Sequence, residues 1–120
     1  MFVYRVETLD GQGPYQGTRN DFIPHVRGID LRKHPIPMED MPTDGPPWHP
    51  YRFGFKSKAQ LRAWFNRLDR KLVASKGFYV RKYKVPKKWV SKGGKQVVFK
   101  PTYAEPVALL DAVTLRPLYA

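Results

Sequence analysis

The sequence predicts an α+β fold in which one main amphipathic helix packs on a small, largely antiparallel sheet. Three observations support this class. Residues 57–76 carry apolar side chains at helical spacing, several short segments are rich in β-branched and aromatic residues, and a proline-rich stretch separates the first strand from the helix. With 120 residues, the chain suits a single domain spanning residues 1–120.

The first predicted strand covers residues 2–8, where apolar and polar side chains alternate. Phe2, Tyr4 and Val6 fall on one face, and Val3, Arg5 and Glu7 on the other. Residues 14–51 then hold 8 of the 12 prolines, which lack a backbone N–H and disfavour regular structure. This stretch is therefore expected to form a long irregular arm.

Residues 57–76 are predicted to form the main helix. Ser57 and Gln60 have the spacing of a capping box, and Gly77 stands where a left-handed C-cap is favoured. The apolar stripe consists of Leu61, Trp64, Phe65, Leu68 and Leu72.

Three strands are expected after the helix, over residues 78–85, 96–100 and 107–113. Lys92-Gly93-Gly94-Lys95 predicts a tight hairpin turn, because paired glycines can supply positive φ angles. Pro101 and Pro106 are expected to interrupt the chain between the last two strands.

The net charge of +12 is concentrated in one segment. Residues 52–100 contain 16 Lys or Arg and a single acid, Asp69, whereas the flanking segments are slightly acidic. Residues 52–100 are therefore interpreted as a basic helix–hairpin unit that attracts an acidic partner, either nucleic acid or an acidic protein surface. The predicted partner-binding residues are Arg62, Arg67, Arg70, Lys71, Arg81, Lys82, Lys84, Lys87, Lys88, Trp89, Lys92 and Lys95.

Other kinds of site receive less support. No cysteine is present, and His25, His34 and His49 lack the spacing of a metal site, so no metal or other cofactor is expected. Ser57 is taken up by the helix cap, and no nucleophile-elbow motif surrounds any serine. The carboxylates Glu39, Asp40 and Asp44 are interpreted as arm residues, and the glycine pair at 93–94 as a turn in preference to a phosphate cradle.

Several phrases together resemble a group of small, uncharacterised bacteriophage and prophage proteins. They are Tyr4-Arg5-Val6-Glu7, Gly13-Pro14-Tyr15, His34-Pro35-x-Pro37-x-x-Asp40, Gly54-Phe55-x-Ser57 with Leu61 and Trp64-Phe65, and Gln96-Val97-Val98-Phe99. This resemblance implies an accessory protein that acts inside the infected bacterium, and it supplies no activity.

A fainter resemblance is to ADP-ribosyltransferase-like folds. It would place Arg5, Ser57 and Gln96 at the positions of the catalytic residues. Gln96 departs from that pattern, because a carboxylate is expected at its position. The resemblance is therefore interpreted as that of an inactive relative, or as chance, in preference to an active transferase.

These observations together predict a phage-type accessory protein that binds an acidic macromolecule, with no enzymatic activity favoured. Inhibition of a host or defence function such as CRISPR is a plausible outcome. The alternatives are an ADP-ribosyltransferase-like enzyme and a DNA-contacting virion assembly protein. With no targeting segment and no apolar run long enough to span a bilayer, a cytoplasmic protein without membrane contact is expected. The sequence leaves the oligomeric state open.

Overall fold

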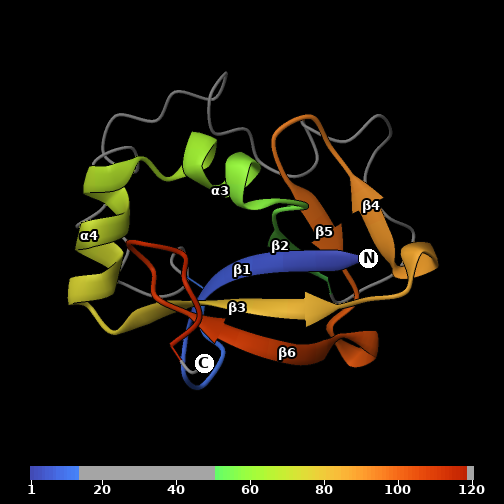
Figure 1. The fold of residues 1–120 in the computed structure, drawn as a ribbon. Coiled ribbons are helices and arrows are strands. Elements are labelled where there is room, and N and C mark those ends of the chain that lie inside the picture. The colour runs from blue at the N-terminus through green and yellow to red at the C-terminus, as the bar shows by residue number, and fades with distance from the viewer. Residues whose placement is uncertain (14–50, 119–120) are drawn as a thin grey trace.

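The computed structural model describes residues 1–13 and 51–118 (Figure 1). Within these residues two α-helices accompany two three-stranded antiparallel sheets, which confirms the predicted α+β class. Almost all of the predicted proline-rich arm, from residue 14 to residue 50, lies outside the described residues.

The first sheet has β3 at its centre, and the second has β5. The first contains β1 (Phe2–Thr8), β3 (Phe78–Lys84) and β6 (Glu105–Leu110) in the order β1-β3-β6. The second contains β2 (Arg52–Gly54), β5 (Val97–Phe99) and β4 (Val90–Lys92) in the order β2-β5-β4.

The two sheets meet where β1 crosses the residue that follows β2. Tyr4 and Phe55 exchange two backbone N–H···O hydrogen bonds there, each 2.8 Å long. Gly54 fits this crossing because a Cβ would lie 2.6 Å from Val3 Cγ1 and 2.9 Å from the Tyr4 carbonyl oxygen. A side chain at position 54 would therefore push the sheets apart.

The predicted single helix is two helices, α3 (Lys58–Trp64) and α4 (Arg67–Ser75). The cap at Ser57 is confirmed, since its side chain accepts a 3.0 Å hydrogen bond from the Gln60 N–H. Asn66 caps α4 in the same way by accepting from the Asp69 N–H, and this second cap marks the break. The break turns Leu68 outward, to 58% exposure. Val73, which was not part of the predicted stripe, is buried in the core instead.

The later strands differ from the prediction in detail. Gly93 donates a 2.8 Å backbone hydrogen bond to Gln96 and closes the predicted hairpin, but positive φ angles among the described glycines occur only at Gly11 and Gly77. The expectation that the glycine pair supplies positive φ is therefore wrong. Pro106 was expected to interrupt the chain, but it lies within β6. A proline is tolerated there because β6 is an edge strand and its register shifts opposite Lys82 and Tyr83.

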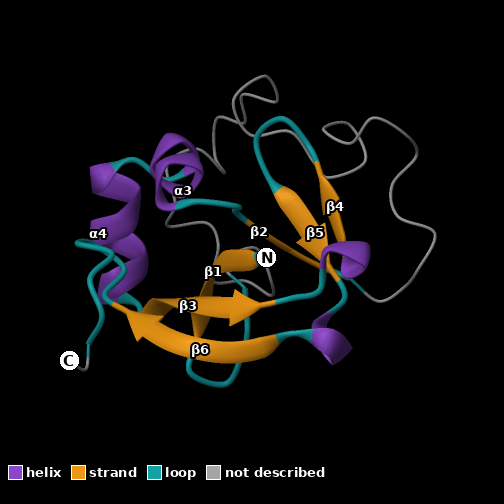
Figure 2. Ribbon diagram, turned by 45° about the vertical axis from the view of Figure 1, so that its right-hand side comes forward, coloured by secondary structure: helices purple, strands orange, loops and turns teal. Residues whose placement is uncertain are grey.

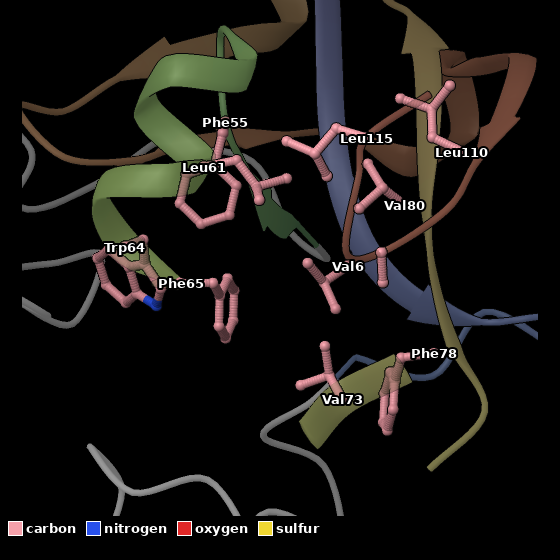
Figure 3. Close-up of a cluster of buried hydrophobic side chains, with 11 residues drawn as sticks. Val6, Phe55, Leu61, Trp64, Phe65, Val73, Phe78, Val80, Leu110 and Leu115 are labelled. Carbon is pink, nitrogen blue, oxygen red and sulfur yellow. The ribbon is translucent and has the colours of Figure 1, made fainter. Parts of the chain in front are cut away.

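Two hydrophobic clusters lie on opposite faces of β1, because successive side chains of a strand alternate. The larger cluster packs Val6 against the helices and includes Phe55, Leu61, Phe65 and Val80 (Figure 3). The smaller cluster gathers Val3, Val85, Val97 and Phe99 beneath the second sheet. Both faces of β1 are therefore buried, although its sequence alternates between apolar and charged residues.

Candidate functional site

The charged face of β1 forms a buried ion-pair cluster around Glu7, whose exposure is 0%. One carboxylate oxygen of Glu7 accepts a 3.0 Å hydrogen bond from Arg5 Nε. The other oxygen accepts from the Tyr83 hydroxyl and lies 3.2 Å from Arg81 Nε. Arg5 also donates to the Phe53 carbonyl oxygen at 2.9 Å. Glu7 therefore connects β1 to β3 through Tyr83 and Arg81, and Arg5 connects β1 to β2 through the Phe53 carbonyl.

The cluster shifts the proton equilibria of its members. Burial lowers the pKa of Arg5, and the neighbouring Glu7 carboxylate partly opposes this effect. Burial and the hydrogen bond to Glu7 raise the pKa of Tyr83 to about 12, because a phenolate beside a carboxylate is disfavoured.

Tyr83 is expected to ionise near pH 12, whereas an ordinary tyrosine ionises near pH 10. Its contribution to stability is therefore fully present below about pH 10 and is lost as the pH rises through about 12. A phenolate absorbance titration of the native protein should show a step near pH 12 that is absent from the titration of the Tyr83→Phe variant. Loss of a step near pH 10 would contradict the assignment.

The sequence indicated Arg5 but missed Glu7 as its partner and Tyr83 as a further partner of Glu7. An alternating strand ordinarily turns its charged face to water, so nothing local showed that Glu7 is buried. The one available indication was composition, because residues 96–99 are almost wholly apolar and can cover that face.

Most of the predicted partner-binding residues fall into two groups, one on α3 and α4 and the other around the β4–β5 hairpin. α4 and the hairpin lie on opposite sides of the molecule in both views (Figures 1 and 2). β3 joins α4 to the hairpin region, and its seven residues span about 23 Å. That distance is more than twice the Debye length of about 8–10 Å at physiological salt. Charges at the two ends of β3 are therefore largely screened from each other, and the partner-binding role of the whole set stays a prediction.

The helix group contains Arg62, Arg67, Arg70 and Lys71. Arg70 is used within the fold, because it donates to the carbonyl oxygens of Val113 and Phe65 at 3.1 and 3.0 Å. Its partial burial and the nearby Arg62 and Arg67 lower its pKa. The other three side chains of the group are exposed.

Two predicted residues of β3 also serve the fold. Arg81 faces Glu7 in the buried cluster, and its side chain is 24% exposed. Lys82 is half-buried, with its Nζ 4.2 Å from the centroid of the Phe2 ring and 5.7 Å from that of Tyr4. Neither side chain is presented fully to an external partner.

The second group is here called the lysine-rich end. It consists of the predicted residues Lys84, Lys87, Lys88, Lys92 and Lys95, which are exposed, together with the half-buried Lys100. They are carried by the end of β3, the β4–β5 hairpin and the 3-10 turn η2 (Lys87–Trp89). Lys100 N–H donates to the Trp89 carbonyl oxygen at 3.1 Å, which joins the two sides of this end.

Two aromatic rings stack within the lysine-rich end. Trp89 of η2 and Tyr103 of the 3-10 turn η3 (Pro101–Tyr103) lie with centroids 4.5 Å apart and planes 9° from parallel. Lys100 Nζ lies 4.9 Å from the Trp89 centroid, and Lys88 Nζ lies 5.6 Å from it. The sequence singled out Trp89 but missed Lys100 and Tyr103, because the stack joins turns separated by a hairpin.

The residues of the transferase resemblance serve separate structural roles. Arg5 is 3% exposed and paired with Glu7, Ser57 caps α3, and Gln96 is 1% exposed at the start of β5. Within residues 1–13 and 51–118, no group of three or more His, Cys, Asp or Glu is placed to hold a metal ion. The histidines and the carboxylates at positions 39, 40 and 44 lie outside the described residues. No helix in the described part of the chain is long and apolar enough to cross a membrane.

Comparison with known proteins identifies the chain as phage-related. Residues 1–112 match the model of a family described as bacteriophage T4 Y00F protein. The chain belongs to the Y00F family. A relative from Enterobacteria phage T4, described as an uncharacterized 19.7 kDa protein in the motB-dexA intergenic region, is 47% identical over 55 residues. That match covers 46% of this chain and 33% of the relative, so it spans about a third of the relative's length.

The Y00F assignment confirms the predicted resemblance to small uncharacterised phage proteins. No solved structure matches this chain. The matches name no ADP-ribosyltransferase, and that resemblance stays a prediction.

Proposed function

We propose that this phage protein is an accessory protein that binds nucleic acid through its lysine-rich end, in the cytoplasm of the infected bacterium. The observation that supports the proposal most directly is the concentration of six lysines, with no arginine, on the hairpin and its adjoining turns. Lysine is a compact point charge suited to phosphate contacts that do not depend on base sequence.

The placement of these lysines favours a specific surface over general solubility. Backbone hydrogen bonds fix the chain segments that carry the lysines, since the Gly93 N–H donates to the Gln96 carbonyl and the Lys100 N–H to the Trp89 carbonyl. Glu105 lies opposite Lys84 in the β3–β6 register. It is the one acidic residue among the described residues of η2, η3 and the strands β3, β4, β5 and β6. The local charge therefore remains strongly positive.

Nucleic acid is favoured over an acidic protein because aromatic rings accompany the lysines at this end. Binding of this kind suits an accessory role in infection, in which the protein competes with host nucleic-acid-handling machinery, a CRISPR defence system included.

Affinity for nucleic acid is expected to fall steeply with salt. If four to six phosphates are neutralised, log affinity should change against log salt with a slope of about −3 to −5. Fluorescence anisotropy of a labelled oligonucleotide, measured over a series of salt concentrations, gives this slope directly. A flat response would contradict phosphate binding.

The assignment to the lysine-rich end is tested by comparing charge reversal there with charge reversal on α4. Lys87→Glu with Lys88→Glu should weaken binding at least tenfold and make the salt slope shallower. The matched control is Arg67→Glu with Lys71→Glu, which changes the net charge by the same amount at exposed positions on α4. Equal losses in both double variants would show general attraction and would overturn the assignment to the lysine-rich end.

A further inference from the structure

The Trp89–Tyr103 stack presents one ring to the core and the other to solvent. Trp89 is half-buried and packs against the cluster of Val3, Val85, Val97 and Phe99. Tyr103 covers it from outside and is 46% exposed. The stack is therefore a supported platform, in which the half-buried Trp89 ring packs behind the Tyr103 ring and Tyr103 is exposed to solvent.

The cations at this platform are placed beside the rings. Lys100 Nζ lies 4.9 and 5.5 Å from the two ring centroids, and Lys88 approaches Trp89. The turns η2 and η3 place the rings, and the hydrogen bond from Lys100 to the Trp89 carbonyl connects them. Aromatic surface and ammonium groups are thus presented together on a fixed backbone.

We propose that this platform binds single-stranded nucleic acid, with an unpaired base stacked on the exposed face of Tyr103 and neighbouring phosphates bound by Lys87, Lys88 and Lys100. The inference deepens the proposed function and rests on it. Single strands are the fitting class because a base inside a duplex has both faces covered, whereas an unpaired base offers a face for stacking.

An acidic peptide is a weaker match to the same surface. Its carboxylates could form ion pairs with the lysines, but they would not stack on the exposed Tyr103 ring. The ring and the lysines together match a polymer that alternates flat bases with phosphates.

The deciding variant is Tyr103→Leu, which keeps apolar cover over Trp89 and removes the aromatic face. It should weaken binding of a labelled oligothymidylate about tenfold, since base–aromatic stacking contributes about 1–3 kcal/mol. Tyr103→Phe should retain near-normal affinity. The corresponding oligouridylate should respond in the same way, because the platform recognises base faces and phosphates.

The matched control is Phe2→Leu. Phe2 is also 46% exposed and has a lysine, Lys82, over its ring. Its side chain points to the face of β1 opposite that of Val3, whereas Trp89 packs against the cluster on the Val3 face. This change should leave the affinity for oligothymidylate unaltered. Thermal unfolding of each variant verifies that the fold is retained. If Tyr103→Leu unfolds, the comparison between the wild-type protein's single-strand and duplex affinities decides the proposal.

The outcomes separate this inference from the proposed function. Preference for single strands over a duplex of equal length, reduced by Tyr103→Leu, supports both. Equal binding of single strands and duplex, with a steep salt slope and no effect of Tyr103→Leu, overturns the stacking platform and leaves nucleic-acid binding standing. Binding of polyglutamate without binding of either nucleic acid overturns both.

Discussion

Replacement of Glu7 with alanine is expected to lower the free energy of unfolding by about 3–5 kcal/mol. Arg5 is 3% exposed and would lose the carboxylate that balances its charge, while Tyr83 would lose its hydrogen-bond acceptor. Removal of one partner from a buried ion pair leaves an uncompensated charge in a medium of low polarity. Since domains are commonly stable by 5–15 kcal/mol in total, the loss is a large fraction of the whole. Chemical denaturation at neutral pH measures it.

Two further variants serve as comparisons for Glu7→Ala. Glu105→Ala removes an exposed carboxylate from β6 and should change stability by no more than about 0.5 kcal/mol. The double replacement Arg5→Met with Glu7→Leu should be less destabilising than Glu7→Ala, because apolar side chains can replace a buried ion pair at little cost. A Glu7→Ala loss as small as that of Glu105→Ala would show that Glu7 is not buried among charges.

Replacement of Phe55 with alanine is expected to destabilise the protein by about 3–5 kcal/mol. Phe55 is fully buried and lies at the crossing of the two sheets, where its ring meets those of Phe53, Trp64 and Phe65 at centroid distances of 5.8–6.1 Å. The cavity would open between the second sheet and α3, and the backbone pairing of Phe55 with Tyr4 limits its collapse. Loss of stability should appear as a lower denaturant midpoint with an unchanged slope.

Leu68→Ala is the informative comparison for this prediction. A continuous helix from residue 57 to residue 76 would bury Leu68 with the other members of the predicted stripe, and its truncation would cost about 2–5 kcal/mol. The break at Asn66 instead leaves Leu68 58% exposed, so the expected cost is below about 1 kcal/mol. A large effect at Leu68 would contradict the two-helix arrangement.

Local chemistry allowed much of the secondary structure to be predicted. Ser57 and Gln60 specify a helix start by hydrogen bonds that span three residues, and Gly77 specifies its end by adopting a φ of 88°. The break between the helices was missed because Asn66 is compatible with a helix interior in the sequence pattern. It acts as a cap only because Phe65 turns into the core, which the neighbouring sheet makes possible.

The sequence by itself determined the α+β class, the positions of β1, β3, β5 and β6 to within a few residues and the excess of positive charge, because caps, periodicity and composition are local properties. It missed the short strands β2 and β4, whose three residues carry too little periodicity to be recognised. Only the tertiary structure decided where that charge lies. β3 separates the helix cations from the lysine-rich end, and tertiary packing leaves Arg5 and Glu7 buried. Both results depend on contacts between segments distant in the chain, such as Tyr103 against Trp89 and Tyr83 against Glu7, and no local pattern encodes those distances.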